Sequence, residues 1–497
     1  MTFTRIVARR IADGISGNIY AGRVTVSGHR ITAVEPGDFV PEKHDIFVDE
    51  DKILTPGFID AHGHSDISLM AMPEAQGKFF QGIAYEISGN CGLSPFPLTE
   101  LNREHLQELY RQYQISLSWN TLAEYQQQLA LRQVALQLFP QVGHNTLRAA
   151  VAGYNTEKLS PNQLQAMCDL LDKELAAGAV GLSLGLLYTP GCFADINEVT
   201  ALLKVTARHN KVCTVHLKSE GNQLEEFLQE MLAAAKRAGL KKLHLSHLKT
   251  AGKANFHKID AILKALDDPE LSVSGDIYCY NASMTQLSVI LPAPFDSYDD
   301  VKNMQLLQDK NVFAKVLTQV KNERESSYWG HVQLISTQKP FDEYCGGFLS
   351  DIARKLGILP EELFLQIVRN DAVGSTAAFH TLSQENMERL AAHANVVPGS
   401  DESARNIESG TFGKSHPRGF GNHAEYFNLR KKQHTPIAQI IREMSGKTAE
   451  IFDLKNVGKI QIDSQAVFNL LDEQDYCSHA VFAAPHNTAS GITPLKL

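Results

Sequence analysis

Residues Thr55 to Asp66 read TPGFIDAHGHSD, and this stretch introduces the pattern that decides the fold. An apolar run with a proline–glycine pair near its start ends at two histidines, His62 and His64. Side chains two residues apart in an extended segment point to the same side of it. The two histidines could therefore bind a metal ion at the end of a buried strand. One His-x-His pair alone does not separate a metal site from an ordinary loop.

Seven further apolar runs follow along the chain, and each ends at a polar or metal-competent residue. The residues that follow them are Cys91, His144, Tyr188, His216, His247, Tyr278 and Asp401. Longer segments with apolar residues at helical spacing, such as PNQLQAMCDLLDKELAAG, separate most of the runs. Eight buried strands alternating with helices are typical of a (β/α)8 barrel, whose functional groups lie at the carboxyl ends of the strands. We therefore predict an α/β fold, a distorted (β/α)8 TIM-type barrel.

Two parts of the chain do not fit the barrel. Residues 1–54 and 451–497 contain short strand-like runs such as RVTVSGHRITAVEPG and GKIQIDSQAVFNLL. We expect them to form one small β domain, because chain ends often lie close together. The barrel then occupies residues 55–450. Within it, residues 285–390 are too long for an ordinary connection between strands seven and eight, so we expect an insertion with helices that forms a lid over the mouth.

Composition narrows the class of protein. The net charge is −9, so no basic field indicates a nucleic-acid or anionic-membrane partner. No apolar run approaches the ~20 residues needed to cross a bilayer. The seven cysteines are scattered and form no CxxC motif, which favours reduced thiols in the cytoplasm. We expect a small-molecule substrate, and the oligomeric state stays open.

The residues at the strand ends form a plausible metal-ligand set. It comprises four histidines, one cysteine in the Gly-rich turn SGNCGLSPFP and one aspartate in VVPGSDES, namely His62, His64, His216, His247, Cys91 and Asp401. Catalytic zinc needs three protein ligands and an open position, and imidazole and thiolate suit it. A metal lowers the pKa of bound water to about 7, and a nearby carboxylate can move that water's proton. The residues alone therefore predict metal-assisted hydrolysis.

Several longer motifs resemble one known family in the order in which they occur. PGFIDAHGHSD, SGNCGLSPFP, VGHNTLRAAVAG, LSHLKTAGKANF and HPRGFG are similar to motifs of the amidohydrolase superfamily. Within it, they resemble the D-aminoacylases, or N-acyl-D-amino-acid deacylases, over residues ~20 to ~450. This resemblance implies zinc-dependent hydrolysis of a linear amide, which releases a carboxylate and a free D-amino acid.

The resemblance also assigns roles to residues. Its tightly bound zinc falls on Cys91, His216 and His247. A second, weaker metal position falls on His62, His64 and Asp401, and Asp401 takes the role of the general base. The residues expected to bind the substrate's α-carboxylate are Lys249, Arg418, Tyr278 and Ser283.

The chain departs from the family's pattern in three places. Gly63 stands between the two histidines where the family usually has threonine, and Ser65 stands where an acid is common. The segment DIYCYNASMTQ is shorter than usual, which leaves the assignments of Tyr278 and Ser283 less firmly fixed, and Tyr280 is the alternative to Tyr278.

Two other readings remain open. One is a different amidohydrolase activity, such as a dihydroorotase, hydantoinase or β-aspartyl dipeptidase. Enzymes for cyclic amides usually bridge two metals with a carboxylated lysine, and the GAVGLSLG strand offers no lysine. The other is a barrel without catalytic function that serves as a scaffold. The sequence does not indicate the preferred D-side chain or acyl group.

Overall fold

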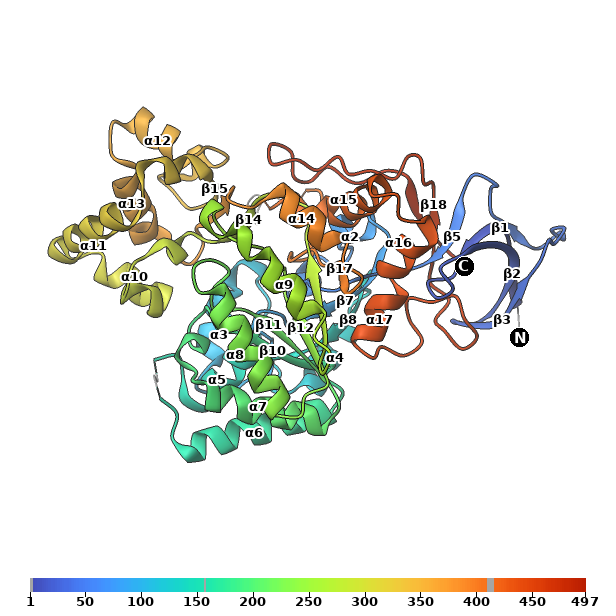
Figure 1. Ribbon diagram of the computed structural model, residues 1–497, viewed down its shortest axis with the longest axis horizontal. Helices are drawn as coiled ribbons and strands as arrows, with labels where there is room; N and C mark the ends of the chain where they lie inside the picture. The colour runs from blue at the N-terminus through green and yellow to red at the C-terminus, as the bar shows by residue number, and fades with distance from the viewer. Residues whose placement is uncertain (1–2, 156–157, 409–414) are drawn as a thin grey trace.

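A barrel of parallel strands forms the centre of the molecule, whose computed structural model describes residues 3–155, 158–408 and 415–497 (Figure 1). Strand pairing runs in the order β6-β7-β8 and then β9-β10-β11-β12-β13-β17. Their bounds are Phe58–Asp60, Ile83–Ser88, Gln137–Pro140, Val142–Gly143, Gly181–Gly185, Val212–His216, Lys242–Leu245, Ser272–Ile277 and Val396–Pro398. Only Gln141 lies between β8 and β9, so they continue one strand run.

The barrel closes between its last and first strands. The Ala61 N–H donates to the carbonyl of Pro398, with an N···O distance of 3.2 Å, and Gly63 and Glu402 form a parallel bridge. Each of the eight apolar runs supplies one strand run, since β8 and β9 belong to the same run. The predicted (β/α)8 barrel is confirmed.

Three helices lie on the outside of the barrel, and the first of them covers the segment PNQLQAMCDLLDKELAAG, which is predicted to be helical. They are α6 Pro161–Ala176, α7 Ile196–Arg208 and α8 Leu224–Arg237. Ser160 caps α6 by accepting the N–H of Gln163, and Pro161 opens the helix, which needs no N–H at that position. Other helices of the barrel are α1 Ser68–Ala71, α2 Gln76–Phe79, α3 Arg103–Leu109, α4 Leu122–Ala130, α5 His144–Ala152, α9 Ile259–Leu266, α14 Gln384–Ala391, α15 Arg418–Lys432, α16 Ile437–Glu443 and α17 Gly446–Ile451.

Strands from both parts of the chain flanking the barrel share one sheet (Figure 1). Its order is β19-β18-β5-β1-β2-β3, with β4 beside β1. The bounds are β1 Phe3–Ala12, β2 Ile19–Ser27, β3 Arg30–Pro36, β4 Ile46–Phe47, β5 Ile53–Pro56, β18 Phe468–Leu471 and β19 Ile492–Leu495. The division of the chain into domains at residues 54 and 450 stays a prediction.

Between β18 and β19 the chain leaves this sheet and runs over α15 (Figure 1). Phe482 in this segment packs with Ala282, Ile335 and Ala378. Its ring also lies 4.8 Å from that of His416, measured between centroids. The segment therefore contacts the insertion and the residues beside the barrel mouth, which the strand-like pattern of residues 451–497 did not indicate.

The insertion between strands seven and eight contains more than the predicted helices. Its helices are α10 Asp300–Leu306, α11 Lys310–Glu323, α12 Leu349–Leu356 and α13 Pro360–Asp371. A three-stranded antiparallel sheet joins them, ordered β14-β16-β15, with bounds Ser283–Gln286, Thr376–Phe379 and Val332–Ser336. A separate apolar core, which includes the buried Trp329 and Phe364, holds the insertion together.

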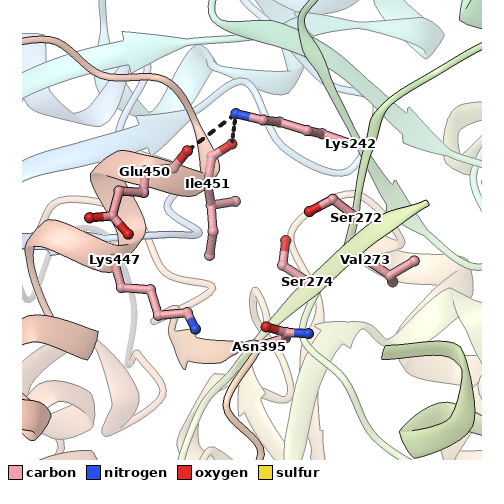
Figure 2. A pocket seen from close by; sticks show the side chains of 8 residues that line it. All are labelled: Lys242, Ser272, Val273, Ser274, Asn395, Lys447, Glu450 and Ile451. Atoms are coloured by element: carbon pink, nitrogen blue, oxygen red, sulfur yellow. Dashed lines mark hydrogen bonds between the residues drawn. The ribbon is translucent and has the colours of Figure 1, made fainter. Parts of the chain in front are cut away.

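The amino ends of β12 and β13 carry a small surface cavity of about 170 Å³ (Figure 2). Lys242, Ser272, Ser274 and Lys447 are among the residues that line it. The Lys242 Nζ donates to the carbonyls of Glu450 and Ile451, so that cation already has partners. Across the described residues, the helices fall short of the length and apolar character that a membrane span requires.

Candidate metal centre

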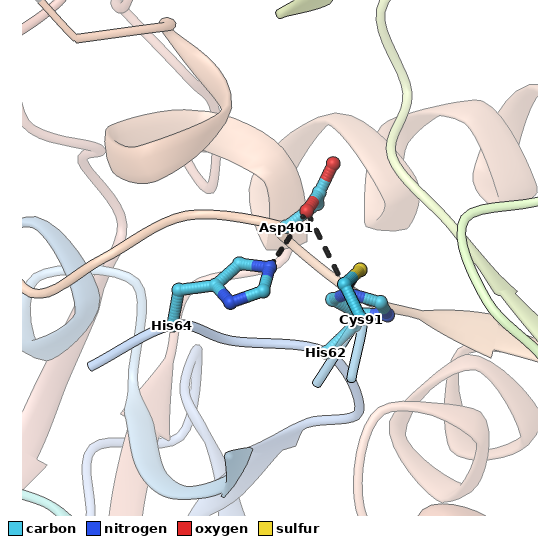
Figure 3. A group of neighbouring side chains, drawn as sticks. All are labelled: His62, His64, Cys91 and Asp401. Atoms are coloured by element: carbon cyan, nitrogen blue, oxygen red, sulfur yellow. Dashed lines mark hydrogen bonds and ion pairs between the residues drawn. The ribbon is translucent and has the colours of Figure 1, made fainter. Parts of the chain in front are cut away.

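The carboxyl ends of the barrel strands bring the predicted ligands into two overlapping groups. We call Cys91, His216 and His247 the cysteine group, and His62, His64, Cys91 and Asp401 the aspartate group (Figure 3). Within each group the ligand atoms all lie within 4.8 Å of one another. Six residues from five different places in the sequence therefore converge at one point.

The cysteine group is compact, and both of its histidines are buried. His216 is the last residue of β11, and His247 follows β12. The Nε2 atom of His247 lies 2.8 Å from Nδ1 of His216 and 3.4 Å from Sγ of Cys91. Both histidines are buried, with 5 % and 2 % of their surfaces exposed. Three atoms that can donate a lone pair thus face one another.

The aspartate group lies beside it. The Oδ1 atom of Asp401 is 3.1 Å from Nε2 of His64 and 3.5 Å from Nε2 of His62 (Figure 3). The His62 Nε2 atom also lies 3.4 Å from the Cys91 sulfur, which links the two groups. The His62 side chain is completely buried, whereas 26 % of the His64 side chain is exposed. This group therefore lies closer to solvent.

Three of the six candidate ligands have a backbone conformation that is rare for residues other than glycine. The φ angles of Cys91, His247 and Asp401 are 52°, 35° and 50°. Such positive φ values cost free energy and persist only where the surrounding structure stabilises them. These three residues are aimed at a common point at that cost, which indicates a functional site.

Burial and neighbouring charges keep Cys91, His216 and Asp401 in forms that suit metal binding. Nearby acidic groups instead outweigh burial and raise the pKa of His62, His64 and His247 in the metal-free protein. Burial alone would raise the pKa of the Cys91 thiol, but His62 and His247 outweigh it and hold that pKa well below its usual value. Burial, followed by the proximity of His247, lowers the pKa of His216 and favours neutral imidazole. Burial would also raise the pKa of Asp401, yet Arg418 and His64 lower it well below its usual value. Thiolate, imidazole and carboxylate are the ligand forms that metals bind.

The donor set fits a metal ion such as zinc. Cysteine and histidine donors in this combination suit zinc, and the aspartate group offers the hard oxygen of Asp401 for a second position. The buried Nε2 atom of His216 has no hydrogen-bond partner among the described residues. The other ring nitrogen, Nδ1, faces the cysteine group and lies 2.8 Å from Nε2 of His247.

Three of the four predicted carboxylate-binding residues surround the two groups. The Arg418 Nη1 atom lies 2.9 Å from Oδ2 of Asp401, at the start of α15. The Lys249 Nζ atom lies 2.6 Å from Oε1 of Glu220. The Tyr278 ring lies beside both cations, with its centroid 4.7 Å from Cζ of Arg418 and 5.7 Å from Nζ of Lys249.

The structure separates the two tyrosine candidates. The Tyr278 hydroxyl is buried and has no hydrogen-bond partner among the described residues, and burial raises its pKa to about 12. The Tyr280 hydroxyl instead donates to the carbonyl of Pro417 at 3.4 Å. Tyr278 therefore has the free hydroxyl. Ser283 opens β14 opposite Phe379, and no hydrogen bond joins its side chain to the two groups within the described residues.

Several buried residues near the ligands carried no signal in the sequence. Asp276 lies inside the barrel on β13 and contacts His62. Glu86 on β7 accepts hydrogen bonds from the backbone and the hydroxyl of Ser65. Lys78 bridges Glu86 and Asp60 at 2.9 and 2.5 Å. Each is a charged residue within or beside an apolar run, a position that is usually unfavourable without a partner.

Glu86 also accounts for an unusual glycine. A Cβ atom on Gly63 would lie 2.1 Å from Cδ of Glu86, so the carboxylate occupies the space of a side chain at that position. The Glu86 carboxylate also accepts a hydrogen bond from the hydroxyl of Ser65, the other position at which the chain departs from the resembled pattern. The Glu86 side chain thus lies against both of these positions.

His144 and Glu220 are also placed by the structure. His144 is completely buried, and its Nε2 atom lies 2.8 Å from Oε1 of Glu198 on α7, so it joins two helices and does not line the mouth. The Oε1 atom of Glu220 lies 3.1 Å from Nδ1 of His247. Burial would raise the Glu220 pKa, but Lys249 and His247 lower it to about 2.

Comparisons with known proteins extend over nearly the whole chain. The N-acyl-D-glutamate deacylase of Alcaligenes xylosoxydans xylosoxydans is 27% identical over 97% of this chain and 90% of its own. The D-aminoacylase of the same organism is 26% identical over 96% of this chain and 90% of its own. No protein-family model matches the chain.

Comparison with solved structures also finds D-aminoacylases. A D-aminoacylase crystal structure, described as defining a novel subset of amidohydrolases, superposes with a TM-score of 0.79 at 26% identity, over 98% of this chain and 94% of its own. A D-hydantoinase reaches 0.53 at 12% identity, over 99% of this chain and 93% of its own, which shows the shared fold alone. By sequence and by structure, the chain is a homologue of the D-aminoacylases in the amidohydrolase superfamily.

Proposed function

We propose that this protein is a zinc-dependent hydrolase that cleaves the amide bond of N-acyl-D-amino acids and releases a carboxylate and a free D-amino acid. The observation that carries the proposal is the convergence of Cys91, His216 and His247 beside Asp401 and Arg418. The relatives named as N-acyl-D-glutamate deacylase and D-aminoacylase support this class of reaction.

The ligands divide into a tight and a weak position. Cys91, His216 and His247 would hold the tightly bound zinc, while His62, His64 and Asp401 would form the weaker position. When bound, zinc polarises the scissile carbonyl and makes the attacking water more acidic. A D-aminoacylase that is 25% identical to this chain is described as having a binuclear metal centre, activated by one metal and attenuated by a second.

Asp401 would move the proton. Because Arg418 and His64 lower the pKa of its carboxyl group, Asp401 is a carboxylate at neutral pH and can accept a proton from the attacking water. The same carboxyl group then delivers that proton to the departing nitrogen, so the leaving group is a neutral amine. One residue thus acts first as base and then as acid.

Two cations would bind the substrate's α-carboxylate. The Arg418 guanidinium is planar and can offer N–H groups to a carboxylate while it stays paired with Asp401. Lys249 adds a second positive charge, and the buried Tyr278 hydroxyl is available to donate. Ser283 completes the proposed set, and its place at the start of β14 ties this end of the site to the insertion.

The rival amidohydrolase activities fit the site less well. The β10 strand reads GLSLG and carries no lysine that could be carboxylated to bridge two metals. The superposition with the hydantoinase is also much weaker than that with the D-aminoacylase. The complete ligand set disfavours a scaffold without catalytic function.

A screen of zinc-loaded protein against matched N-acetyl-D- and N-acetyl-L-amino acids tests the proposal, with release of free amine as the measurement. We expect hydrolysis of D-forms alone. Asp401→Asn should keep the tight zinc and lower kcat on the order of 10³-fold, since general acid–base catalysis contributes about that much. Asp453→Asn is a matched control, because Asp453 also has a positive φ, of 53°, but ion-pairs with Lys242 at the other end of the barrel.

Other outcomes would overturn the assignment. Hydrolysis of L-forms alone would exclude D-acyl specificity, and hydrolysis of hydantoins alone would favour the rival activity. A chain that binds zinc but hydrolyses none of these amides would favour the scaffold.

We also propose that the protein acts on a small molecule in the cytoplasm. All seven cysteines are free, which supports a reducing compartment. The net charge of −9 gives no support for a nucleic-acid or anionic-membrane partner.

A further inference from the structure

Three polar residues occupy the interior of the barrel directly beneath the metal centre. Ser274 and Asp276 lie two residues apart on β13, so they point to the same side of that strand. His244 lies on β12, in register with Ser274. All three are buried, and Asp276 and His244 are completely inaccessible. Barrel interiors are usually filled by branched apolar side chains, so a buried carboxylate and imidazole at this place require compensation.

The compensation is a continuous chain of hydrogen bonds. The Ser274 Oγ atom lies 2.8 Å from Nδ1 of His244, and Nε2 of His244 lies 2.9 Å from Oδ2 of Asp276. That same carboxylate oxygen is 3.2 Å from Nδ1 of His62. The chain therefore runs from Ser274, which lines the cavity of Figure 2 at the amino end of the barrel, up to a candidate metal ligand.

The Asp276 carboxylate touches both ligand groups. Its Oδ2 atom faces the His62 ring of the aspartate group, and its Oδ1 atom accepts the backbone N–H of His247, of the cysteine group, at 3.1 Å. Gly399 leaves room for this carboxylate, because a Cβ atom there would lie 2.4 Å from Oδ1 of Asp276. One buried side chain thus fixes a ring of one group and the backbone of the other.

We propose that Asp276 is a positioning residue that couples the two metal positions, with His244 and Ser274 holding its carboxylate in place. The inference rests on the proposed function of this site as a metal centre. When His62 donates its Nδ1–H to Asp276, its Nε2 lone pair is left facing Cys91 and Asp401, at 3.4 and 3.5 Å. A ligand histidine with a fixed tautomer binds metal more tightly.

The test compares Asp276→Asn with Asp276→Ala in metal-free protein titrated with Co²⁺. Total bound cobalt after each addition reports the first and second equivalents, and absorption by the cobalt–thiolate bond reports when Cys91, which both groups share, becomes a ligand. The asparagine oxygen can still accept the N–H of His247, but its NH₂ group cannot accept the Nδ1–H of His62, so the His62 tautomer is no longer fixed. We expect Asp276→Asn to weaken only the second equivalent, by about 10- to 100-fold, and Asp276→Ala to weaken both.

A second variant and a control separate positioning from general destabilisation. His244→Phe removes one donor to Asp276 without leaving a cavity, and should weaken the second equivalent by less than Asp276→Asn does. Glu443→Gln removes another buried carboxylate, whose Oε1 atom lies 2.9 Å from Nη2 of Arg430. This pair is not among the candidate ligands or their partners. This control should bind cobalt as the wild type does, even if its melting temperature falls.

The outcomes distinguish the inference from the proposed function. Unchanged second-equivalent binding in Asp276→Asn would overturn the inference and leave the function standing. Equal weakening of both equivalents in Asp276→Asn would also overturn it, as would a wild-type protein with a single position. A wild-type protein that binds no metal would overturn the proposed function itself.

Discussion

The two ligand groups at the barrel mouth share Cys91 but differ in how their polar atoms are satisfied. In the aspartate group, Asp401 already has His64 and Arg418 as partners. In the cysteine group, the donor atoms of Cys91, His216 and His247 face one another. A metal ion would compete with the ion pair between Asp401 and Arg418 in the first case, and only with hydrogen bonds between side chains in the second. The difference teaches why one position should be tight and the other weak.

Removing the shared cysteine should have the largest effect on metal binding, because it takes a ligand from both groups. Cys91→Ala deletes the thiolate of both groups, so zinc affinity should fall by about 100-fold or more, since even the loss of an outer partner costs 10- to 100-fold. The measurement is zinc per chain after dialysis, together with kcat. Cys168→Ala, on the outer helix α6, should keep both values. Full zinc content in Cys91→Ala would contradict the cysteine group.

Gly63→Ala should affect metal binding by the aspartate group and not by the cysteine group. The added Cβ atom would meet the Glu86 carboxyl group at 2.1 Å, and such overpacking typically costs about 1–3 kcal/mol. The strain falls on the segment with His62 and His64, so the weaker metal equivalent should be lost while the tight zinc stays. Gly330→Ala is the control, because its Cβ atom would meet only Ser350 at 3.9 Å. Loss of the tight zinc alone would contradict the comparison.

The smallest effect concerns Glu220 beside the cysteine group. Its pKa is about 2 in the folded protein and about 4.3 in the unfolded chain, so the unfolded state binds more protons as the pH falls. The stabilisation is complete above about pH 4.3 and is lost towards pH 2. In urea unfolding of metal-free protein, Glu220→Gln should therefore lose less stability between pH 5.5 and 3.5 than the wild type. An equal loss in both proteins would exclude this contribution.

The barrel could be predicted because its strands are short apolar runs that each end at a polar residue. The same rule placed His216, His247 and Asp401 at one edge before any contact was known. The rule did not predict a role for Asp276 or Glu86, because nothing in the neighbouring sequence shows what a charged residue within an apolar run pairs with. Their role depends on partners from other strands.

The sheet of the insertion and the backbone conformation at the site could not be predicted from the sequence, for other reasons. The β14 and β16 strands pair across a long stretch of intervening chain, and their runs are too short to stand out. The positive φ angles of Cys91 and His247 depend on the surrounding structure, because only a few per cent of residues other than glycine adopt that conformation. Tertiary contacts decide both features.

The sheet formed by the two ends of the chain has a consequence for biosynthesis. Strand β5 pairs with β1 on one side and with β18 on the other, and β18 lies beyond the entire barrel in the sequence. A ribosome therefore has to complete the barrel before the second edge of β5 can be covered. Until then, that edge presents unpaired backbone groups to other nascent chains, so slow translation or early termination would favour aggregation.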